Sequence, residues 1–172
     1  MCHIVVLFCC EIQPILLGVI RGKSCNLSSG GKMTSFTIIR EIESPVEKVW
    51  DIVGNFMESP GPGITVTVEE KGDHAAGGVG AVREITIGKV CVRERLESIN
   101  PPHSFSYRVL SGAPMKDYLA HVEFSLKDNT TIVQWKVELT PKIPLTGWIC
   151  CKVSKGAVNS YLDEVENAAN KA

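Results

Sequence analysis

The sequence lacks an excess of charge of either sign. Its 18 Lys and Arg residues are balanced by 19 Asp and Glu residues, which leaves a formal net charge of −1. A groove for nucleic acid needs a basic stripe that neutralises phosphates. This balance therefore argues against nucleic acid as a partner.

The sequence also lacks the spacings of a metal centre or a disulfide framework. No C-x-x-C pair occurs among its seven cysteines, and its four histidines are scattered along the chain. Zinc sites and disulfide-rich domains both depend on characteristic ligand or cysteine spacings. We therefore expect no metal, no cofactor and reduced thiols in a cytoplasmic protein. The adjacent Cys150 and Cys151 are expected to help fill one helix.

Long apolar runs are missing after residue 34, so we expect no stable membrane insertion of the domain that follows. Residues 1–33 differ from the rest of the chain. They are apolar at first but are interrupted by Glu11, Gln13 and Pro14, lack a basic start and end in a Gly/Ser-rich linker. We predict that residues 1–33 are a leader, with targeting to an organelle as one role, or an upstream extension of the coding frame. Residues 34–172 are long enough for one domain with its own core.

The domain begins with a regular pattern of alternating apolar residues, which is typical of half-buried strands. The alternation predicts strands over residues 35–43, 64–70, 81–87, 89–99, 104–110, 118–126 and 131–139. A short helix is predicted over 44–56, capped by Ser44 with Pro45 at its first position. An amphipathic helix is predicted over 147–170. Short hairpins make the sheet antiparallel. The predicted fold is an α+β helix-grip, with a curved antiparallel sheet of about seven strands around a long C-terminal helix and an internal cavity.

Three predicted strands place one polar residue each on their drier face, namely Arg83, Glu94 and Tyr118. A buried carboxylate is costly unless it is paired or faces a polar cavity. One interpretation is a partly buried Arg83–Glu94 ion pair with Tyr118 in the core. The other is an apolar pocket with a few convergent polar groups, the usual form of a small-molecule site. There Arg83 would hold a carboxylate or enolate oxygen, Glu94 would hold a hydroxyl or move a proton, and Tyr118 would donate a hydrogen bond.

The predicted site combines these three polar residues, which are also the candidate catalytic residues, with neighbours on the sheet and on the C-terminal helix. The predicted ligand-binding residues are Arg83, Glu94, Tyr118, Ile85, Val92, Tyr107, Ala120, Val158 and Leu162.

Four motifs, "SPVEKVWDIVGNF", "GGVGAVREITIG", "VRERLESI" and "KDYLAHVEF", resemble the START-like (SRPBCC) superfamily in their order and spacing. The closer resemblance is to its polyketide-cyclase/dehydrase and lipid-transport branch, and it covers residues 35–170. The chain is similar to plant abscisic-acid receptors and to lachrymatory-factor-synthase-type enzymes. The resemblance implies a helix-grip with a large internal cavity. It places the pocket positions of the receptors, and the catalytic positions of the enzymes, on Arg83, Glu94 and Tyr118.

The chain departs from the receptors at their functional loops. Their Ser-Gly-Leu-Pro gate is replaced by a direct reversal at Gly88, and their Gly-x-His-Arg-Leu loop is replaced by "SGAPMKDY". Their ligand-binding Lys falls near Thr65. These departures argue against a gated hormone receptor. We expect binding or transport of a small hydrophobic ligand, such as a lipid, polyketide, terpenoid or phenolic. The alternative is a small cyclase, dehydratase or isomerase that uses the same residues for acid–base chemistry. The oligomeric state stays open.

Overall fold

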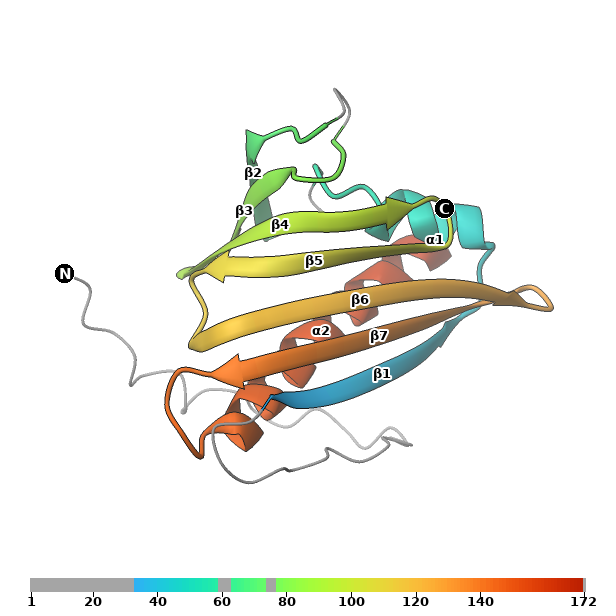
Figure 1. The fold of residues 1–172 in the computed structure, drawn as a ribbon. Helices are drawn as coiled ribbons and strands as arrows, with labels where there is room; N and C mark the ends of the chain where they lie inside the picture. The colour runs from blue at the N-terminus through green and yellow to red at the C-terminus, as the bar shows by residue number, and fades with distance from the viewer. Residues whose placement is uncertain (1–32, 59–62, 74–76, 172) are drawn as a thin grey trace.

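The computed structural model describes residues 33–58, 63–73 and 77–171, and the predicted leader over residues 1–33 lies outside these ranges except for Met33. The described chain forms a sheet and two helices (Figure 1). In chain order the elements are β1 (Thr34–Ile42), α1 (Val46–Val53), β2 (Ile64–Glu70), β3 (Val82–Ile87), β4 (Val90–Asn100), β5 (Ser104–Ser111), β6 (Met115–Lys127), β7 (Thr130–Pro141) and α2 (Gly147–Lys171). The predicted α+β architecture is confirmed.

All seven strands belong to one antiparallel sheet, in the order β1-β7-β6-β5-β4-β3-β2. Strands β2 to β7 follow one another as hairpins, as their short connections predict. The first strand then pairs with the last, from Thr34 opposite Leu139 to Ile42 opposite Thr131. The predicted reversal at Gly88 is confirmed, because this residue has a φ of 59°, which glycine adopts without steric cost.

Helix α2 crosses one face of the sheet, called the inner face below (Figure 1). It packs against β1, β7 and α1, and its apolar stripe includes the buried Val158, Leu162 and Val165. Burial of such a stripe is the main source of stability for an amphipathic helix. Cys150 and Cys151 are buried in the same helix, as predicted.

An ionic contact fixes the far half of α2 to the first strand. The guanidinium of Arg40 in β1 donates to Asp163 at 2.7 Å and to Glu166 at 3.1 Å. Because the two acidic residues lie one turn apart, both reach the same guanidinium. The contact therefore fixes the position of the helix along the strand.

The start of α1 differs from the prediction. The helix begins at Val46, and Pro45 occupies the N-cap position without a side-chain cap, so the predicted Ser44 cap is wrong. Ser44 is buried, and its carbonyl accepts a hydrogen bond of 2.6 Å from the Thr131 hydroxyl at the start of β7. This tertiary contact holds the turn before the helix in place of a local cap.

No helix in the described part of the chain is long and apolar enough to cross a membrane.

Candidate functional site

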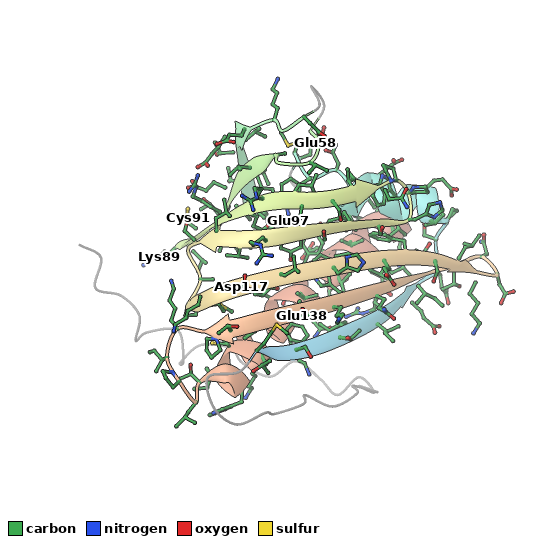
Figure 2. The ribbon with its side chains drawn as sticks, viewed as in Figure 1. Glu58, Lys89, Cys91, Glu97, Asp117 and Glu138 are labelled. Atoms are coloured by element: carbon green, nitrogen blue, oxygen red, sulfur yellow. The ribbon has the colours of Figure 1, made fainter. Side chains whose placement is uncertain are left out.

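The two faces of the sheet differ sharply in polarity. On the outer face, which is turned away from α2, Glu97, Asp117 and Glu138 project from β4, β6 and β7 (Figure 2). Arg108 forms ion pairs with Glu97, at 3.6 Å, and with Asp117, and Lys136 lies 2.7 Å from Glu138. Solvent-exposed pairs of this kind contribute little to stability. A charged group on the inner face is therefore the exception that needs an explanation.

Arg40 of β1 is one such group, and it is partly exposed and paired with Asp163 of α2. The pair Arg83–Glu94, on the inner face of β3 and β4, is more deeply buried. The strand register places the two residues directly opposite one another, and they are 8% and 7% exposed. Nε and Nη2 of Arg83 donate to Oε2 of Glu94 at 3.1 and 2.9 Å. The first of the two interpretations is confirmed for the ion pair, and Tyr118 is buried in the core as that interpretation expects. The ligand pocket of the second interpretation stays a prediction.

A third contact completes the surroundings of the Arg83 guanidinium. Nη1 donates to the backbone carbonyl of Phe56 at 2.8 Å, and the guanidinium lies 3.8 Å from the centroid of the Phe56 ring. The aromatic face attracts the cation, and the carbonyl uses a donor that Glu94 does not reach. Phe56 follows α1, and its role as a partner of Arg83 was not visible in the sequence pattern.

Three phenols surround the same region. Tyr107 on β5 and Tyr118 on β6 are 6% and 7% exposed, and their ring centroids lie 6.3 Å apart. Tyr161 joins them from α2. Burial raises the pKa of Tyr107 and of Tyr118 well above the ordinary range, and the negative charge of Glu94 adds to both shifts. Burial likewise raises the pKa of Tyr161 to about 12. The cluster of Arg83, Glu94 and the three phenols is called the interior polar cluster below.

Trp135 on β7 borders this cluster. Its ring centroid lies 5.5 Å from that of Tyr161 and 6.1 Å from that of Tyr107. The indole Nε1 is buried, and no hydrogen-bond partner for it is found among the described residues. Tyr161 and Trp135 were missed as site residues. Each could have been identified as a polar group in an otherwise apolar stripe, at 161 on the helix and at 135 on the strand.

The remaining predicted ligand-binding residues separate into two groups. Ile85 and Val92 face one another across β3 and β4 on the inner face and are half-buried. Ala120, Val158 and Leu162 are buried in the packed core. Contact of these residues with a ligand stays a prediction.

One surface pocket, of about 290 Å³, lies elsewhere. It is lined by His103, Ser104, Glu123, Phe124, Ser125, Ile132 and Gln134. Most of these residues belong to the outer face, and none is among the predicted site residues. This pocket is therefore not the predicted internal cavity, which stays a prediction.

The sequence profile described as polyketide cyclase / dehydrase and lipid transport matches residues 33–169. A search of curated proteins finds no match to the sequence.

Three solved structures share the fold. The crystal structure of Ara h 8.0201 is 15% identical, with a TM-score of 0.68, and the alignment covers 82% of this chain and 100% of that one. An uncharacterised protein from Bacillus thuringiensis is 22% identical, with a TM-score of 0.65 and coverage of 78% and 97%. The protein XoxI from Bacillus cereus is 22% identical, with a TM-score of 0.65 and coverage of 78% and 94%. At these identities the likeness shows a Bet v1-like helix-grip fold and nothing further.

The buried ion pair predicts how the free energy of unfolding changes when one or both of its partners are replaced. We expect Arg83→Met or Glu94→Leu alone to lower the free energy of unfolding by about 3–5 kcal/mol, because each leaves an unpaired charge in the interior. The double variant should recover most of that loss. Denaturant unfolding of the four proteins measures the coupling. The control is Arg93→Met, which breaks the exposed Arg93–Glu69 pair and should cost about 0–1 kcal/mol. Additive single effects for the Arg83 and Glu94 variants would contradict the prediction.

The phenols generate a pH prediction. The chain has three tyrosines, and all three have a raised pKa in the folded state. The unfolded chain loses these protons near pH 10, whereas the folded chain keeps them, so alkali favours unfolding. Stability should be unaffected by these groups below pH 10 and should fall by about 1.4 kcal/mol per pH unit for each tyrosine above it. Near-ultraviolet absorbance of the phenolate measures the titration. Ionisation of any tyrosine near pH 10 while the fold persists would show that the phenol is not buried.

Proposed function

Since this chain belongs to the polyketide cyclase / dehydrase and lipid transport family, in which membership implies binding of a hydrophobic ligand, we propose where and how that ligand binds. The ligand is a small, mostly apolar molecule with at least one oxygen. It lies between the inner face of β3, β4 and β5 and helix α2, next to the interior polar cluster. Lipids, polyketides, terpenoids and phenolics all have this character.

Accessible apolar surface beside the cluster is the observation that carries this proposal. Ile85 and Val92 lie on the same face as Arg83 and Glu94, Ile85 two residues after Arg83 on β3 and Val92 two residues before Glu94 on β4. Val109, opposite Glu94 on β5, is half-buried like them. Interiors are normally close-packed, and the inner-face residues from Tyr118 to Phe124 on β6 are buried accordingly. Apolar side chains that keep accessible surface on this part of the inner face therefore support a space for an apolar guest.

Tyr161 supports the same position from the helix side. Its side chain keeps an intermediate exposure, although burial raises the pKa of its phenol to about 12. Accessible surface within a dense shell of protein atoms is expected where a side chain borders an interior space. The charges of Arg83 and Glu94 both contribute to the pKa shift of Tyr161, so this space would adjoin the ion pair.

The polar cluster supplies a small number of orienting groups. Both hydrogen bonds from Arg83 to Glu94 end on Oε2, so Oε1 accepts none from Arg83. Oε1 can accept a bond from a ligand hydroxyl, and the phenols of Tyr118 and Tyr161 can donate to a ligand carbonyl. A largely apolar site with few polar groups is what gives a small-molecule pocket its affinity and its orientation.

A pair of variants tests the proposed position. Val92→Trp adds bulk to the inner face, whereas Cys91→Trp adds the same ring to the outer face one residue away. We expect Val92→Trp to weaken binding of the fluorescent probe 8-anilinonaphthalene-1-sulfonate by about tenfold or more, because each lost apolar contact lowers affinity. Cys91→Trp should leave binding unchanged.

Native mass spectrometry of the full chain, purified without detergent, complements this titration. A retained small-molecule adduct that Val92→Trp abolishes and Cys91→Trp preserves would identify the natural ligand. Equal probe affinity in the two variants, or no probe binding by the unmodified chain, would overturn the proposed position.

A second candidate function is acid–base catalysis in the same place. It is favoured by one observation, that a carboxylate, a guanidinium and a phenol meet in the dry interior at Glu94, Arg83 and Tyr118. In this reaction class Arg83 would stabilise an oxyanion and Glu94 would move a proton, with Tyr118 as a donor.

The variant Glu94→Gln distinguishes the two functions, because it keeps the shape of the side chain and one oxygen that can accept from Arg83 but removes the carboxylate that could transfer a proton. For an enzyme we expect turnover of a reactive enone or polyketide-like substrate to fall by about a hundred- to ten-thousand-fold, with affinity retained. For a carrier the unmodified chain releases every bound compound unchanged. Full turnover in the Glu94→Gln variant would exclude Glu94 as the catalytic acid or base.

A further inference from the structure

Exposed apolar side chains gather at one end of the molecule, on the β7–α2 connection and the first turns of α2. Leu145 is 83% exposed, and the others are 42% to 63% exposed. The set, called the end patch below, consists of Ile143, Leu145, Trp148, Ile149 and Val153. Scattered single apolar residues are normal on a surface, but a contiguous group marks an interaction site.

Helical spacing and a tight turn make the end patch contiguous. Ile149 and Val153 lie one turn apart on the same side of α2, and Trp148 is next to them. Before the helix, the Thr146 hydroxyl and backbone N–H both donate to the carbonyl of Ile143, at 2.7 and 3.4 Å. This turn places Ile143 and Leu145 beside the helix start. Figure 1 shows this connection at the opposite end of the sheet from the β6–β7 hairpin.

The connection presents Leu145 to solvent in an unusual conformation. Leu145 has a φ of 69°, in the left-handed region that bulky L residues rarely adopt. The chain before it is held by Lys142, whose backbone N–H donates to Pro114 and whose side chain donates to Ala113. The loop therefore holds a large apolar side chain away from the protein.

The charged residues within the chain segment that carries the end patch are of one sign, and Asp117, opposite Thr140 on β6, is paired with Arg108. Residues 139–162 contain Lys142, Lys152 and Lys155 and no Asp or Glu. The acidic residues that border this range are paired with basic ones, Glu138 with Lys136 and Asp163 with Arg40. An apolar surface bordered by unopposed cations is complementary to a surface that is apolar inside and anionic outside.

We propose that the end patch binds the surface of an anionic lipid membrane. The aliphatic side chains enter the boundary between headgroups and acyl chains, Trp148 occupies the interfacial layer that its amphipathic ring favours, and the lysines contact the headgroups. The opposite side of α2 stays packed on the sheet through Cys151, Val158 and Leu162, so docking requires no unfolding. The attachment is peripheral. It does not depend on the ligand proposed above.

The test uses the full chain and vesicles of phosphatidylcholine with or without phosphatidylserine. We expect the unmodified chain to co-float with the anionic vesicles, more weakly at high salt because the lysine contacts are screened. Leu145→Asp should lower the partition coefficient by about tenfold or more. Aspartate tolerates positive φ, so this variant is expected to fold normally. The matched control is Leu126→Asp at the β6–β7 hairpin, which is 58% exposed and should bind like the unmodified chain.

Tryptophan fluorescence localises the contact. Trp135 is buried and Trp50 is partly buried, so a blue shift on vesicle addition should come from the exposed Trp148 and should vanish in Trp148→Phe. Three results would overturn the proposal. They are no binding to anionic vesicles, equal binding by Leu145→Asp and Leu126→Asp, and a dimer in solution that Leu145→Asp alone dissociates. The last would assign the end patch to a second copy of this chain.

Discussion

The burial of one side of α2 against one face of the sheet is the constraint on which the rest of this structure depends. An amphipathic helix must bury its apolar stripe, and one face of the seven-stranded antiparallel sheet is the surface available for this burial. That contact buries one face of the sheet and leaves the other exposed to water, so alternate side chains along each strand point to the interior and to solvent. Every polar group on the dry side is then costly unless its neighbours compensate it.

The interior polar cluster follows from that division. Arg83 and Glu94 lie on the dry side, and they persist there because the β3–β4 register sets them opposite one another, with Phe56 supplying a carbonyl and an aromatic face. Such a pair is weak evidence for stability, since an apolar pair of similar volume often serves as well or better. Its combination with two buried phenols, one partly buried phenol and half-buried apolar neighbours gives the cluster a chemical character that a purely structural core does not need. This character matches a family in which membership implies a hydrophobic ligand.

Helix α2 has different roles at its two ends. Its C-terminal half is fixed to β1 by Arg40, Asp163 and Glu166, and its middle contributes Tyr161 to the polar cluster. Its first turns carry the exposed part of the end patch. A single rigid element therefore connects the proposed ligand site to the proposed membrane surface, which suits a protein whose guest is poorly soluble in water.

The local sequence pattern determined the strands of this protein and the face on which their polar residues lie. Alternation at period two predicted the strands and placed Arg83, Glu94 and Tyr118 on the dry side, because the side-chain period of a strand is fixed by its backbone. Only the tertiary structure decided what these residues meet. The partnership of Arg83 with Phe56, the approach of Tyr161 and Trp135, and the replacement of the predicted Ser44 cap by a bond from Thr131 join segments that are distant in the chain. The residue pattern of one segment does not specify which distant segment packs against it. These contacts therefore form only when the sheet and the helix pack together.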